Sequence, residues 1–76
     1  MSINDKVPSE DGSGWSFSIQ PPGSDERRLV VVNLADARGA EVVALKTVSG
    51  TVHFRSEVPP TVVKDMGLKP GEVRVI

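Results

Sequence analysis

Residues 29–34 read Leu29-Val30-Val31-Val32-Asn33-Leu34, an almost unbroken run of apolar and largely β-branched side chains. Such residues favour strands, and a strand without polar alternation is typical of one that is covered on both faces. We therefore expect this stretch to be the central and most buried strand of a sheet, with the other elements arranged around it.

A second strand is expected just upstream. Trp15-Ser16-Phe17-Ser18-Ile19 alternates strictly between large apolar and small polar side chains, and this period of two indicates a half-buried strand. The next run, Pro21-Pro22-Gly23-Ser24-Asp25, cannot continue it, because proline removes a ladder donor and Pro-Gly favours a turn. The only tryptophan of the chain thus lies at the start of the first strand.

Residues 41–55 predict a β-hairpin around the dipeptide Ser49-Gly50, because two segments of compatible pattern flank a two-residue turn. The preceding residues 35–40 are expected to form a loop in which Gly39 can adopt a positive φ. One face of the hairpin is apolar and comprises Val43, Leu45, Thr47, Val52 and Phe54. The other face is largely polar and basic and comprises Ala44, Lys46, His53 and Arg55.

Residues 58–76 predict one short helix, a tight turn and a final strand. Proline is tolerated in the first turn of a helix and glycine is favoured just after its end, so we expect a helix from Pro60 to Met66. Lys69-Pro70-Gly71-Glu72 places proline and glycine at the central positions of a type II turn. The last strand is then expected to comprise Val73, Val75 and Ile76.

The 76-residue chain carries nine Lys and Arg, ten Asp and Glu, one His and no Cys. This length predicts one small domain, and the lack of cysteine excludes disulfides and thiolate metal sites. Residues 1–14 are polar and rich in Gly, Ser and Pro, so we expect a disordered acidic arm before a single domain at 15–76. Residues 1–26 hold one Lys and five acidic side chains, a net charge of −4, whereas residues 27–76 hold eight basic and five acidic ones, a net charge of +3.

Together these patterns predict a small α+β domain, a twisted and mainly antiparallel sheet of four to five strands with one short helix and a disordered N-terminal arm. No apolar run approaches the ~18 residues of a membrane span. The N-terminus carries only Lys6 and no apolar segment typical of a secretory signal. We therefore expect no membrane association and a cytoplasmic location.

The residue types that catalysis and metal binding require are scarce in this chain. His53 is the only histidine, the serines fall in loops or in the first strand, and no Gly-rich phosphate loop precedes a helix. We expect no catalytic residue, no metal ligand and no cofactor.

Protein binding makes smaller demands on a sequence, because an exposed anchor surrounded by charges is sufficient. Tryptophan is enriched among interface hot spots, although its large area favours a core position for Trp15 beside Phe17 and Ile19. The residues that we expect to contact a protein partner are Val7, Trp15, Arg27, Arg28, Lys46, His53 and Arg55.

Part of the C-terminal run resembles the swapped-hairpin motif of AbrB-type transition-state regulators and related antitoxins. The matching residues are Val58, Pro59, Met66, Gly67, Leu68, Lys69, Pro70, Gly71, Glu72 and Val73. The resemblance implies a dimer that binds DNA through clustered cations. The cations available for such a patch are Arg27, Arg28, Arg38, Lys46 and Arg55.

In size and layout the chain also resembles small proteins of lytic bacteriophages that bind host RNA polymerase. Those proteins lack cysteine and catalytic motifs, and they change the contacts of the polymerase with sigma factor or promoter. This resemblance implies a non-catalytic inhibitor or regulator of transcription that acts as a monomer in the host cytoplasm. We favour it over the AbrB-like alternative, because a net charge of −1 is unusual for a protein that neutralises several DNA phosphates.

Overall fold

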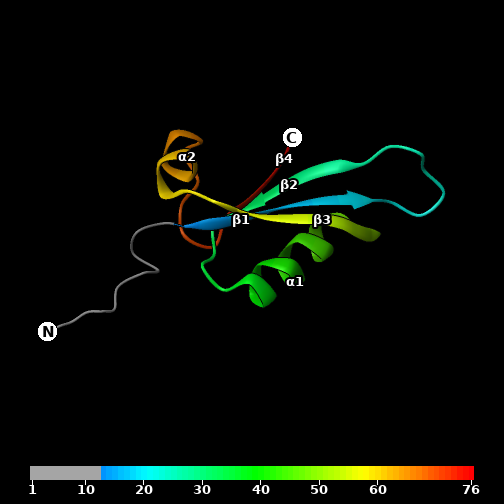
Figure 1. Ribbon diagram of the computed structural model, residues 1–76, viewed down its shortest axis with the longest axis horizontal. Helices are drawn as coiled ribbons and strands as arrows, with labels where there is room; N and C mark the ends of the chain where they lie inside the picture. The colour runs from blue at the N-terminus through cyan, green and yellow to red at the C-terminus, as the bar shows by residue number, and fades with distance from the viewer. Residues whose placement is uncertain (1–12) are drawn as a thin grey trace, which may run out of the picture.

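A computed structural model describes residues 13–76, which form a four-stranded antiparallel sheet with a helix on either side (Figure 1). The spatial order of the strands is β3-β1-β2-β4.

The predicted α+β class and its antiparallel sheet of four to five strands are confirmed. The predicted arm at residues 1–14 falls almost entirely outside the described residues, and Gly14 already belongs to the first strand. Along the chain, the elements are β1 (Gly14–Gln20), β2 (Arg28–Val32), α1 (Ala37–Thr47), β3 (Thr51–Val58), α2 (Pro60–Asp65) and β4 (Val73–Val75).

The two inner strands, β1 and β2, are the strands that the apolar patterns predict. Trp15 pairs with Val32 and Ser18 pairs with Leu29, so the two strands form an antiparallel hairpin. The alternation in β1 places Phe17 in the core, where it is fully buried. The valines of β2 are buried on both faces of the sheet, as expected for a central strand.

The predicted hairpin at residues 41–55 is wrong, because its first half is helical. Asp36 caps α1 by accepting a hydrogen bond from the Gly39 N–H at 2.7 Å, so Gly39 lies inside a helix and has no positive φ. β3 pairs with β1 instead of with residues 41–48, and Ser49-Gly50 connects a helix to a strand. The described residues therefore contain two helices where the sequence predicts one.

One face of the sheet holds the larger core beneath α1. Ala40 and Ala44, one helical turn apart, are fully buried, and their small side chains let the helix lie close to the strands. α1 packs over β1, β2 and β4 and leaves most of β3 uncovered. The buried members of this cluster are Phe17, Ile19, Val30, Val32, Ala40 and Ala44.

The opposite face is covered at only one end, by α2 and the turn that follows it. The predicted helix, turn and last strand are confirmed: α2 begins at Pro60, Gly67 follows it with a φ of 73°, and Glu72 N–H donates to the Lys69 carbonyl at 2.9 Å. Val63 and Leu68 pack there against strand residues. The part of this face beyond α2 leaves exposed Leu29, Phe54 and Ile76.

Buried Asn33 holds the C-terminal segment against β2. Its side-chain Nδ2–H donates to the Leu68 carbonyl at 2.9 Å. Its backbone N–H donates to the Glu72 carbonyl at 2.9 Å, and its carbonyl accepts from the Gly71 N–H at 2.8 Å. A buried amide is tolerated when it is satisfied in this way, and these bonds position β4 as the fourth strand.

Candidate functional site, a groove between α1 and β3

A shallow depression, here called the β3 groove, lies between α1 and β3 on the larger-core face of the sheet. It exists because α1 covers the inner strands and stops short of β3. Smaller depressions that include Val52, His53 and Thr51 continue it along β3. Its main lining residues are Trp15 from β1, Arg55 from β3, and Arg38, Glu41, Val42 and Leu45 from α1.

The floor of the groove is apolar and well anchored. The Trp15 indole N–H donates to the Ala35 carbonyl at 2.9 Å, which fixes the ring beside the start of α1. Trp15 is half-buried and packs against the larger core cluster, so it acts as a core residue and also presents a surface. Val42 is 50% exposed, and Leu45 is partly buried next to the same cluster.

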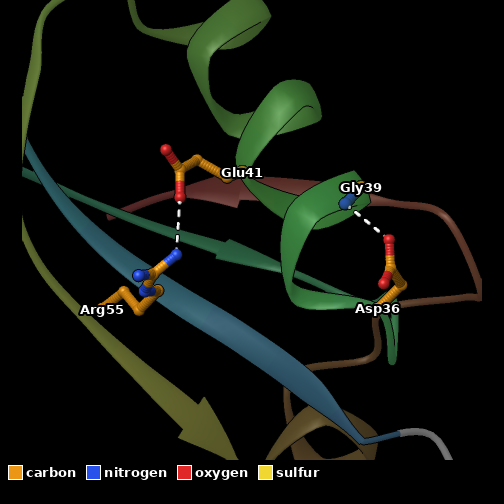
Figure 2. Close-up of polar contacts among 4 residues, drawn as sticks. All are labelled: Asp36, Gly39, Glu41 and Arg55. Carbon is orange, nitrogen blue, oxygen red and sulfur yellow. Dashed lines mark hydrogen bonds and ion pairs between the residues drawn. The ribbon is translucent and has the colours of Figure 1, made fainter.

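Among the described residues, three of the four charged side chains that line the groove already have a partner. Arg55 Nη1 lies 3.0 Å from Glu41 Oε1, an ion pair that connects β3 to α1, and Asp36 is used by the helix cap (Figure 2). The Arg38 side chain makes no hydrogen bond or ion pair with another residue of the range 13–76. The Arg38 guanidinium can therefore bind a carboxylate of a partner next to the apolar floor of the groove.

The structure brings some of the predicted partner-binding residues together and separates others. Trp15 and Arg55 line the groove, and His53 lies next to them in β3, with Nε2 at 2.7 Å from Gln20 Oε1. Lys46 is in the last turn of α1, so it does not share a hairpin face with His53, which corrects that prediction. Arg28 begins β2 and Arg27 precedes it, neither lines the groove, and Val7 lies outside the described residues.

The α1 side of the groove is the part that the sequence interpretation missed. The sequence patterns predict a loop or a strand for Arg38, Glu41, Val42 and Leu45, and neither element places them opposite Trp15. The available signal was Asp36, a favoured N-cap residue, followed by Ala40 and Ala44 at helical spacing.

Residues 13–76 contain no cluster of three or more His, Asp or Glu side chains able to hold a metal ion. In the same part of the chain, no helix is long and apolar enough to cross a membrane. In comparisons with known proteins, no family model, no curated protein and no solved structure matches this chain.

Proposed function

We propose that this protein is a non-catalytic, protein-binding regulator that acts in the cytoplasm on the transcription machinery, with bacterial RNA polymerase as its partner. The observation that carries the protein-binding part is the β3 groove. It combines a half-buried tryptophan with exposed apolar surface at Val42 and a guanidinium at Arg38. Aromatic anchors and arginines are the residues that dominate binding energy at protein interfaces.

The choice of partner is supported by the chain's resemblance to small phage proteins. Those proteins share the small size of this chain and its lack of cysteine. An exposed groove is an appropriate surface for protein binding, since a partner can make side-chain contacts with its aromatic, apolar and guanidinium groups.

The test is a pull-down from a bacterial lysate treated with nuclease, using the tagged full chain. We expect the polymerase subunits to be retained in near-stoichiometric amounts. The variant Val42→Glu places a charge on the apolar part of the groove and should reduce retention about tenfold or more. Val62→Glu is the matched control, because Val62 is 43% exposed on α2, outside the groove.

Two results would count against the proposal. Equal retention by the Val42→Glu and Val62→Glu variants would place the binding surface outside the groove. Retention that occurs only when DNA is left intact would reject protein binding as the primary activity, and would favour the AbrB-like alternative. In that case binding should weaken steeply with salt concentration.

A further inference from the structure

The outer edge of β3 is the most accessible backbone of the sheet. β3 is an edge strand of eight residues and contains no proline, whereas β4 at the other edge has three residues. An edge strand presents unpaired N–H and C=O groups, and a long one is a template for pairing with another chain. Residues 13–76 supply no strand that covers this edge.

We propose that two copies of this chain pair antiparallel through β3, about a two-fold axis that passes through Ser56. In this register residues 54–58 of one copy lie opposite residues 58–54 of the other. These five residues are the regular part of β3, which pairs without interruption from Gly14 opposite Val58 to Ser18 opposite Phe54. The register shift that follows, between Ser18 and Ile19, lies outside the proposed contact.

The order of charges along β3 favours this register. It also favours a second copy of this chain as the partner that pairs with the edge. Arg55 and Glu57 lie two residues apart and therefore point to the same face of the sheet. An axis at Ser56 places each Arg55 opposite Glu57 of the other copy, so that two opposite-charge pairs form. An axis at Arg55 would instead bring two like charges together. A surface that complements itself across a two-fold axis is what a symmetric dimer requires.

The side chains at this edge are free to make the proposed contacts. The Arg55 side chain is 55% exposed, and its bond to Glu41 uses only one of its five N–H donors. On the other face, Phe54 is 63% exposed and would lie opposite Val58 of the second copy.

The proposed pairing extends the β3 groove. A two-fold axis perpendicular to the sheet keeps both copies of α1 on the same face. The two uncovered β3 strands then form the floor of one trough, and the two α1 helices form its walls. This inference differs from the monomer that the phage resemblance implies. It goes beyond the protein-binding proposal and can be rejected independently of it.

Sedimentation equilibrium of the full chain tests the pairing directly. We expect a concentration-dependent equilibrium between 8.1 kDa and twice that mass. Arg55→Glu should weaken it about tenfold or more, because two attractive pairs become repulsive, and Glu57→Arg should do the same. An equimolar mixture of these two variants should associate as well as the wild type. In the mixed dimer the carboxylate introduced at position 55 faces the guanidinium introduced at position 57, and the second pair is the native one.

Glu41→Gln is the control for the intramolecular ion pair: it frees Arg55 from Glu41 without removing a side chain of the proposed contact, so it should not weaken association. A wild type that remains at 8.1 kDa up to millimolar concentration would overturn the proposal. So would association that is insensitive to Arg55→Glu, or a mixture that fails to restore it. If the chain is monomeric and still retains polymerase, the pairing is rejected and the protein-binding proposal stands.

A cross-link provides a second measurement, because the chain contains no cysteine. Ser56→Cys places two thiols opposite each other at the proposed axis, and mild oxidation should yield a disulfide-linked dimer in high yield. Ser18→Cys on the inner strand β1 is the matched control and should yield little dimer. Equal yields from the two variants would contradict pairing through β3.

Discussion

The two phenylalanines of this chain lie on neighbouring strands and face opposite sides of the same sheet. Phe17 in β1 is fully buried under α1, whereas Phe54 in β3 is 63% exposed on the face that α2 covers only at one end. The side chains are chemically identical, so their difference reflects their places in the fold, an inner strand beneath a helix and an edge strand without one. The face under α1 holds the larger buried cluster, and the opposite face leaves Phe54 exposed.

The two helices account for this difference. α1 has eleven residues, a side-chain cap at Asp36 and two buried alanines that permit close packing. α2 has six residues, starts at Pro60 without a side-chain cap, and buries only Val63. The longer helix covers the inner strands and the shorter helix covers the end of the sheet.

The largest effect is expected for Phe17→Ala. Removing a buried aromatic ring leaves a cavity and should lower the free energy of unfolding by about 3–5 kcal/mol. A small domain is stable by roughly 0.05–0.15 kcal/mol per residue, so much of the variant should be unfolded in water. Urea titration followed by circular dichroism measures this, and Phe17→Leu, with an expected loss of about 1–2 kcal/mol, provides a folded comparison.

Asn33→Ala should have the next largest effect, at the end of the sheet held by α2. It removes the donor to the Leu68 carbonyl in a buried site, and a lost buried hydrogen bond costs about 1–3 kcal/mol. Hydrogen exchange should become faster in β4, because Asn33 connects the preceding turn to β2. Unchanged exchange in β4 would show that the strand is held mainly by its pairing with β2.

Asp36→Ala tests the cap that positions α1. Loss of the bond to the Gly39 N–H should cost about 1 kcal/mol, within the usual range for N-cap substitutions. Asn is an equally good cap, so Asp36→Asn should retain nearly all of the stability. If the two variants were equally destabilised, the negative charge would matter more than the hydrogen bond. Thermal denaturation of the wild type, Asp36→Ala and Asp36→Asn measures these differences in stability.

Phe54→Ser should have the smallest effect on the isolated domain. The ring is mostly exposed, and substitutions at such positions usually change the free energy of unfolding by less than about 0.5 kcal/mol. The same urea titration used for Phe17→Ala provides the matched measurement. A loss above about 1 kcal/mol would contradict the distinction between the buried face at Phe17 and the exposed face at Phe54.

The parts of the fold that follow from short-range rules were predictable. Pro60 at the start of α2, Gly67 after its end and the Pro70-Gly71 turn each act through backbone geometry that a few neighbouring residues determine. The strict alternation of residues 15–19 was equally informative, because small polar side chains separate its large ones.

The segment at residues 41–48 was not predictable in the same way. Val43, Leu45 and Thr47 fit a period of two, while Ala40, Ala44 and Val48 fit a helical period. The choice depends on packing, because the alanines fit beneath a helix that lies on Phe17 and Val30. The same ambiguity affects the candidate site. The sequence indicates Trp15 and Arg55 as candidate contact residues, but it does not indicate the side of the groove that α1 forms.

Trp15 also gives the protein a built-in optical reporter. It is the only tryptophan, and the chain has no tyrosine, so near-ultraviolet emission arises almost entirely from this one indole. Its N–H is bonded to the loop before α1, and its ring touches both the core and the groove. Unfolding should shift the emission to longer wavelength, and occupation of the groove should change its intensity without any added label.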